Sequence, residues 1–247
     1  GWEALRCAAR RGSGQRSLTQ VRLKGLAELP GDAWVDWQLA ALHDAGISEV
    51  AIVTGYRREL LSRCGLVEFH NPRWDETNML SSLACAQEWL LAEPCIVSYS
   101  DIFYEASAVK LLMMSAASLA ITYDPHWLKL WEKRFGDPLL DAETFRMNSD
   151  KNLVEIGHKP KSVEEVQGQY MGLVRVTPEG WGELLRVRAG LSAAECDLMH
   201  MTGSLQKVIE EGRLVVHAIA YEQSWGEIDS VGDLLAYQEG SVLGDRN

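Results

Sequence analysis

Two aspartates follow strand-like segments at distant points of the chain. Asp101 lies four residues after the short apolar run 94–97, and Asp229 follows a second such run, 214–220. In an open α/β sheet, residues just past the carboxyl ends of strands line the ligand crevice. Mg²⁺ in proteins takes one or two carboxylates and completes its octahedron with waters and substrate phosphates. We therefore predict that Asp101 and Asp229 bind one Mg²⁺ that carries a polyphosphate. The alternative is that both are strand-end or turn aspartates without a ligand.

A loop rich in glycine and serine near the start could hold the phosphates. Residues 12–14 read Gly-Ser-Gly and are surrounded by basic side chains, among them Arg11, Arg16 and Lys24. Backbone N–H groups in such a loop can point at a phosphate, and the cations would neutralise its charge. The alternative is a solvated turn, because short Gly-x-Gly patterns with basic neighbours are common.

Lys159 is the candidate for a second phosphate. It ends a short strand-like stretch, and Pro160 follows it. A compact ammonium group held at a strand end suits a phosphate monoester. The alternative is an ordinary solvated surface lysine.

An unusual aromatic and charged stretch lies between these motifs. Trp127 and Trp131 are four residues apart and would share one face of a helix, with Arg134, Asp141 and Glu143 further on. Aromatic faces near carboxylates can hold an ammonium group by cation–π attraction and charge pairing. We predict that these five residues bind the second substrate; the alternative is that the tryptophans pack under a lobe.

The segments that must position these residues alternate between strand and helix. Periodicity and turn signals predict helices over 33–45, 79–92 and 106–116, one more helix ending at residue 61, and strands over 49–54, 95–99, 118–123, 153–156 and 169–176. This alternation predicts an α/β fold: a doubly wound, mostly parallel, Rossmann-like sheet. After Asp124 the rhythm changes, which predicts antiparallel edge strands. We expect a single domain over 1–247, with 124–180 as a small inserted antiparallel lobe that faces the second substrate.

Composition limits the partners and the compartment. The 247 residues are 47% hydrophobic and carry a formal net charge of −11, so the surface should repel nucleic acid and anionic membranes. The five cysteines lack metal or disulfide spacing, which predicts reduced thiols in a cytoplasmic protein. The sequence also lacks an apolar run long enough to span a membrane and the layout of a signal peptide at its start.

The motifs at the start resemble the signature of the nucleotidyltransferase family that includes sugar-phosphate nucleotidyltransferases and phosphocholine cytidylyltransferases. Ala8 and Ala9 match the end of the first strand, Gly12 and Ser13 match the phosphate loop, and Lys24 matches the signature lysine. There are departures. Arg10 replaces a glycine, Gly14 stands at the loop arginine and Leu23 replaces a proline. Arg16 is then the candidate to replace the missing loop arginine.

The resemblance extends along nearly the whole chain. It places Asn78 and Ser82 in the nucleotide-binding segment, although Asn78 as a simple helix cap is an equal alternative. It assigns the two metal aspartates to Asp101 and Asp229, and the lysine that binds the acceptor phosphate to Lys159.

The resemblance implies a Mg²⁺-dependent nucleotidyltransferase, with CTP as the favoured nucleotide. Such an enzyme joins CMP to a small phosphorylated or phosphonate acceptor and releases pyrophosphate, with Lys24, Arg16 and Lys159 neutralising phosphate charge. One alternative is a sugar-1-phosphate nucleotidyltransferase that uses another nucleoside triphosphate. A second is a non-catalytic nucleotide-binding relative, because the phosphate loop is altered. Monomer and homodimer stay open.

Overall fold

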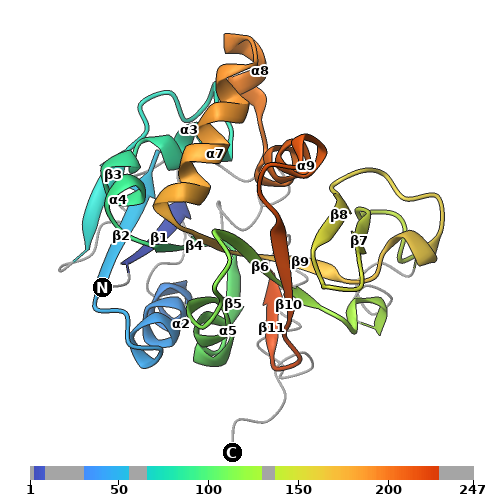
Figure 1. Ribbon diagram of the computed structural model, residues 1–247. Coiled ribbons are helices and arrows are strands. Elements are labelled where there is room, and N and C mark those ends of the chain that lie inside the picture. Colours follow the sequence, from blue (N-terminus) through green and yellow to red (C-terminus); the bar gives the residue numbers. More distant parts are fainter. Residues whose placement is uncertain (1–2, 9–30, 56–65, 130–136, 228–247) are drawn as a thin grey trace, which may run out of the picture.

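A seven-stranded sheet forms the centre of the molecule (Figure 1). The computed structural model describes residues 3–8, 31–55, 66–129 and 137–227. The strand order is β10-β6-β9-β4-β1-β2-β3. These strands are β1 (Glu3–Ala8), β2 (Glu49–Thr54), β3 (Val67–His70), β4 (Cys95–Tyr99), β6 (Leu119–Asp124), β9 (Gln169–Val176) and β10 (Val216–Ala220).

All neighbours in this sheet pair in parallel except those of β9. The β1 strand pairs in parallel with β2 and β4, and β6 pairs in parallel with β10. The β9 strand runs antiparallel to both β4 and β6. The prediction of a doubly wound, mostly parallel sheet is therefore confirmed.

The prediction that the segment after Asp124 forms edge strands is wrong for β9. This strand lies inside the main sheet, and its last six residues, 171–176, are buried. A strand with neighbours on both sides and helices on both faces is largely apolar, as its Met-Gly-Leu-Val-Arg-Val end shows. Arg175 is the exception, and its buried side chain donates to Ala117 O at 2.7 Å. The part of 124–180 outside the main sheet therefore ends before Gln169.

Helices cover both faces of the sheet (Figure 1). On one face lie α2 (Gly31–Asp44) and α5 (Ala106–Met113). The helices on the other face include α3 (Met79–Ala84), α4 (Gln87–Ala92), α7 (Pro178–Ala189) and α9 (Met201–Glu211), and α8 (Ala193–Leu198) precedes α9.

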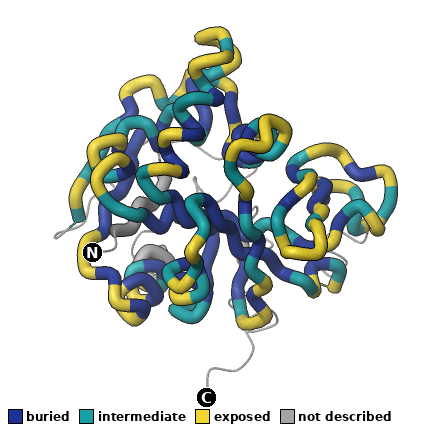
Figure 2. Tube along the Cα trace, in the orientation of Figure 1, coloured by how far each residue is buried: buried dark blue, intermediate teal, exposed yellow. Residues whose placement is uncertain are grey.

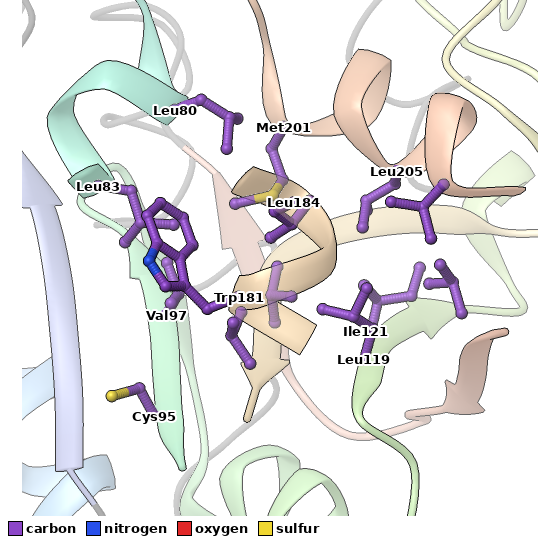
Figure 3. Close-up of a cluster of buried hydrophobic side chains, with 14 of the residues drawn as sticks. Leu80, Leu83, Cys95, Val97, Leu119, Ile121, Trp181, Leu184, Met201 and Leu205 are labelled. Carbon is purple, nitrogen blue, oxygen red and sulfur yellow. The ribbon is translucent and has the colours of Figure 1, made fainter. Parts of the chain in front are cut away.

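Alternate residues of each strand enter the two cores. Ile96 belongs to the core under α2 and α5, whereas the adjacent Val97 belongs to the core under α3, α7 and α9. Figure 3 shows the second core, in which Trp181 of α7 lies among side chains of the sheet and the neighbouring helices. In Figure 2 the central strands are largely buried, and exposed residues follow the outer surface of the helices.

Three predicted helices differ in extent from the observed ones, and the one over 33–45 differs least, since α2 spans Gly31–Asp44. The helix predicted over 79–92 is interrupted at Cys85 and Ala86, so that α3 and α4 are separate. No glycine or proline marks this break, and local sequence therefore does not signal it. The helix predicted over 106–116 ends at Met113, and the one predicted to end at residue 61 lies outside the described residues.

A small lobe stands beside the main sheet (Figure 1). It contains the antiparallel pair β7 (Phe145–Met147) and β8 (Leu153–Ile156), and the short 3₁₀ helix η3 (Val163–Glu165). A third sheet pairs β5 (Ile102–Tyr104) with β11 (Trp225–Glu227). None of the helices in the described ranges has the length and apolar character needed to cross a bilayer.

A buried carboxylate connects α7 to the residues around α9. Glu183 is 7% exposed, accepts hydrogen bonds from Arg186 at 2.6 and 3.2 Å, and lies 3.5 Å from Arg213 Nε. The hydrogen bonds from Arg186 lower the pKa of Glu183 below its ordinary value of 4.5. A carboxyl with a lowered folded-state pKa contributes stability at pH above its unfolded pKa and loses that contribution as the pH falls.

Glu183→Gln should therefore lower the free energy of unfolding at pH 7 by about 1–2 kcal/mol, since a charge-assisted pair becomes a neutral contact. Urea unfolding of both proteins at several pH values measures the difference. It should be constant above about pH 5 and should shrink as the pH falls through 4.5 and below. A difference that grows toward acid pH would contradict this role of Glu183.

Candidate functional site at the carboxyl edge of the sheet

Asp101 lies at the carboxyl end of β4. Tyr99 ends this strand, Ser100 and Asp101 form a two-residue turn, and β5 begins at Ile102. Asp101 is partly exposed. Because β4 is an inner strand of a mostly parallel sheet, its carboxyl end is where such folds bind ligands.

The β11 strand lies beside the segment that follows Asp101. Glu227 pairs with Ile102 and Trp225 pairs with Tyr104, in antiparallel register. The second predicted metal ligand, Asp229, lies outside the described residues. In the described part of the chain, no three His, Cys, Asp or Glu side chains gather so that they could hold a metal ion. A metal at Asp101 would therefore need a ligand from another part of the chain or from a substrate.

A buried hydrogen bond anchors the start of β11 to the end of β6. The indole Nε1 of Trp225 donates to Asp124 Oδ2 at 2.8 Å, and Asp124 Oδ1 accepts from the backbone of His126 at 2.7 Å. Both Trp225 and Asp124 are at most 9% exposed. The Asp124 carboxylate therefore holds two strand ends together at the same edge of the sheet as Asp101.

Two tyrosines face each other at the start of β9. The rings of Tyr99 and Tyr170 form an edge-to-face pair with centroids 5.7 Å apart. Gly172 has φ +96°, and a Cβ placed on it would lie 2.9 Å from Tyr99 Cγ. The β9 register also shifts opposite β6 in this region, between the pairs at Ile121 and Tyr123. Only glycine fits here without strain, because it tolerates this φ and leaves room for the ring.

Asn78 and Ser82, which were predicted to bind the nucleotide, are buried. Asn78 precedes α3, and its side-chain amide donates to Leu198 O at 2.9 Å. Ser82 lies within α3, and its hydroxyl accepts from Asn71 Nδ2 at 3.0 Å. Asn78 occupies the N-cap position of α3, as the helix-cap alternative predicts, but its side chain makes no capping hydrogen bond.

Of the other residues predicted to contact the nucleotide, the structure places Ala8 alone. Ala8 is the last residue of β1, which pairs with β2 and β4 and therefore ends at the same edge as Asp101. Ala9, Gly12, Ser13, Arg16 and Lys24 lie outside the described residues.

Trp127 lies inside the small lobe. It is 4% exposed, packs against Ala142 and Val166, and donates its Nε1 to Val166 O at 2.9 Å. This environment matches the packing alternative for Trp127. Trp131 and Arg134 lie outside the described residues.

Three of the predicted acceptor-side residues lie on adjacent segments of the lobe. The Lys159 ammonium donates to Leu139 O at 2.9 Å and to Leu140 O at 3.0 Å, directly before Asp141. Backbone hydrogen bonds between Thr144 and residues 157 and 158 join the same two segments just after Glu143. Lys159, Asp141 and Glu143 are all exposed. Their arrangement leaves a cation and two carboxylates accessible on one part of the lobe.

Sequence reasoning missed several residues that shape this edge. Gln38, Tyr99, Asp124, Tyr170 and Gly172 had no predicted role. The sequence does contain one signal for Gln38. This polar residue precedes Ala41 by three positions and Leu42 by four, so it lies on the apolar face of its helix. The other four residues acquire their role from contacts between distant segments.

Comparisons with known proteins identify the family. Residues 12–144, more than half of the chain, match the MobA-like NTP transferase domain. The CTP:phosphoglutamine cytidylyltransferase of Campylobacter jejuni is 32% identical, over 94% of this chain and 97% of that protein.

Solved structures share the fold. The inositol-1-phosphate CTP transferase from T. maritima matches with a TM-score of 0.72 and 19% identity, over 99% of this chain and 96% of that chain. The CTP:phosphocholine cytidylyltransferase from Streptococcus pneumoniae matches with a TM-score of 0.68 and 19% identity, over 96% of this chain and 98% of that chain. The long sequence match and the shared fold agree, and the chain belongs to the MobA-like NTP transferase domain family and is a nucleotidyltransferase.

Proposed function

We propose that the protein is a Mg²⁺-dependent cytidylyltransferase that transfers CMP from CTP to a small phosphorylated acceptor. The observation that carries the proposal is the antiparallel pairing of β5 with β11. It sets Glu227 opposite Ile102, one residue after Asp101. Asp229 follows Glu227 by two residues, which span at most about 7 Å, so a continuation of this pairing would bring Asp229 within reach of Asp101.

The choice of nucleotide and acceptor follows the relatives. The C. jejuni relative is named for CTP and phosphoglutamine, and it aligns with 94% of this chain. Phosphoglutamine is therefore the first acceptor to test. A phosphonate acceptor would present the same kind of oxygen nucleophile and belongs in the same panel.

The reaction needs little covalent chemistry from the protein. An acceptor phosphate oxygen forms a bond to the α-phosphorus of CTP, the bond from that phosphorus to the bridging oxygen breaks, and pyrophosphate leaves with the electron pair. The acceptor phosphate is already an anion at neutral pH, so no side chain has to remove a proton. Catalysis then depends on position and on charge neutralisation.

The predicted residues divide this task. Asp101 and Asp229 would hold Mg²⁺, which supplies positive charge at the α-phosphate. Lys24 and Arg16 would neutralise the departing phosphates, and Lys159 would bind the acceptor phosphate. The lobe that carries Lys159, Asp141 and Glu143 would present a charged surface to an acceptor that has both a phosphate and an amine.

A pyrophosphate-release assay with four nucleoside triphosphates tests the function. The acceptors are phosphoglutamine, phosphocholine, inositol 1-phosphate, glucose 1-phosphate and an aminoalkyl phosphonate. We expect activity with CTP and Mg²⁺ and with an acceptor that is not a hexose phosphate. Activity confined to another nucleotide with glucose 1-phosphate would favour the sugar-phosphate alternative. Tight CTP binding by calorimetry without any pyrophosphate would indicate that the altered phosphate loop no longer supports turnover.

Lys159→Met should raise the KM for the acceptor about 10- to 100-fold, because one charge-assisted hydrogen bond to a phosphate contributes about 1.5–3 kcal/mol. The KM for CTP should change less than threefold, roughly 0.6 kcal/mol. Steady-state kinetics with each substrate varied in turn measures both constants.

Lys161→Met is the matched control, since Lys161 is an exposed lysine two residues away that bonds within the lobe through its backbone, whose N–H donates to Glu165 Oε2 at 2.8 Å. It should leave both constants unchanged. An equal effect of the two substitutions would mean that only the net charge of the lobe matters.

A further inference from the structure

Gln38 is a buried polar residue that contacts the turn before and after Asp101. It lies in α2 and is 0% exposed. Its side-chain nitrogen donates to Tyr99 O at 2.9 Å and to Ile102 O at 2.5 Å. These two carbonyls flank the Ser100–Asp101 turn, so one amide group connects both ends of the turn.

The orientation of the Gln38 amide is fixed by its partners. Both partners are backbone carbonyl oxygens, which only accept hydrogen bonds, so the nitrogen must face them. The NH₂ group has two hydrogens, one for each carbonyl. Neither carbonyl would keep this donor if Gln38 were replaced by an apolar residue.

Other contacts hold the same turn from the strand side. Ser98 Oγ donates to Tyr99 O at 2.9 Å and accepts from Tyr104 OH at 2.8 Å. The rings of Trp37 and Phe103 meet edge to face with centroids 6.0 Å apart, which seats α2 against β5. Tyr99 O therefore accepts hydrogen bonds from Ser98 on the strand and from Gln38 on the helix. Ile102 O, at the other end of the turn, accepts from Gln38.

We propose that Gln38 is a positioning residue for Asp101: its amide sets the width and direction of the turn that presents the carboxylate to the metal. This inference rests on the proposed function, in which Asp101 binds Mg²⁺. Mg²⁺ demands near-ideal octahedral geometry, so a small displacement of one carboxylate weakens binding. Residues that orient a metal ligand without touching the metal typically change affinity 10- to 100-fold.

The test measures how strongly a divalent metal improves CTP binding. Calorimetry gives the Kd of CTP in EDTA and in Mn²⁺. The Kd in EDTA divided by the Kd in Mn²⁺ is the metal-dependent gain in CTP affinity. We expect Gln38→Met, which has similar volume but no donor, to reduce this gain about 10- to 100-fold while the Kd in EDTA changes less than twofold. Gln38→Glu should reduce the gain at least as much, since its carboxylate would face two carbonyl oxygens.

Asp101→Asn separates a failure of this inference from a failure of the proposed function. If Asp101→Asn keeps the full metal-dependent gain, Asp101 is not a metal ligand and the proposed function loses its metal site. If Asp101→Asn removes the gain but Gln38→Met retains it within twofold, only the positioning role is overturned.

Leu42→Ala controls for lost stability. Leu42 is fully buried on the same helix, one turn further on, and belongs to the core under α2 and α5. It should lower the unfolding temperature at least as much as Gln38→Met and leave the metal-dependent gain unchanged. If Leu42→Ala also loses the gain, Gln38 acts through stability alone and the inference is overturned.

A shorter amide provides a second variant if Gln38→Met does not fold. Gln38→Asn keeps the NH₂ group but draws it back by one methylene, so it should reduce the gain by an intermediate factor. A full gain in this variant would show that the amide need not reach the turn.

Discussion

Asp101→Asn should lower kcat/KM for pyrophosphate release about 1,000-fold or more while the fold stays intact. The substitution keeps the shape of the side chain and removes its charge. One of the two carboxylates proposed for the metal is then lost, which costs about 4 kcal/mol of transition-state stabilisation. Asp229→Asn should have a comparable effect, because both carboxylates would hold the same ion.

The measurement is steady-state pyrophosphate release at saturating Mg²⁺, with thermal unfolding to verify the fold. Asp44→Asn is the matched control: the same chemical change at an exposed position at the end of α2. It should leave turnover unchanged. Turnover of Asp101→Asn within tenfold of the unsubstituted protein would remove Asp101 from the metal site.

Gly172→Ala should destabilise the protein by about 2–4 kcal/mol. The backbone of Gly172 has φ +96°, and the new Cβ would lie 2.9 Å from Tyr99 Cγ. Alanine therefore adds backbone strain and forces the Tyr99 ring away from its contact with Tyr170. For a chain of this size, we expect the unfolding temperature to fall by about 5–15 °C.

Activity should fall further than stability alone explains. Tyr99 O accepts one of the Gln38 hydrogen bonds, and Tyr99 precedes Asp101 by two residues. Kinetics at a temperature well below the unfolding transition would separate the two effects, because the variant is then fully folded. A folded Gly172→Ala variant with normal turnover would show that the Tyr99 ring does not help to position the turn.

Gly182→Ala is the opposite case and serves as the control. Gly182 is exposed in the middle of α7, and a Cβ placed on it meets nothing within 4 Å. Alanine has the higher helix propensity, so this variant should gain about 1 kcal/mol. Equal destabilisation by the two substitutions would contradict the explanation given for Gly172.

Local sequence predicted the type of several described elements and the bounds of four strands, but it gave no prediction for others, α7 among them. The strands at 49–54, 95–99, 153–156 and 169–176 have the predicted limits. Buried strands read as short apolar runs between turn signals, and amphipathic helices repeat every three to four residues. These are properties of neighbouring residues, and they need no knowledge of the fold.

Local sequence did not predict how the segments assemble. The 169–176 strand was expected at an edge and lies inside the sheet, because strand order depends on pairing with β4 and β6. Local sequence left open whether Trp127 binds the second substrate or packs under a lobe, and the structure places it in the lobe core with its N–H bonded to Val166 O. In both cases the partner, a neighbouring strand for β9 and Val166 for Trp127, lies dozens of positions away in the sequence.

The sequence by itself determined the α/β class, the resemblance to nucleotidyltransferases and Asp101 as a candidate ligand at a strand end. Only the tertiary structure decided what holds Asp101 in place. Gln38 lies 61 residues before Tyr99 and 64 before Ile102, and it meets both only because α2 packs beside β5. Hydrogen bonds of this kind join segments that are distant in the chain, so no local pattern of residue types can reveal them.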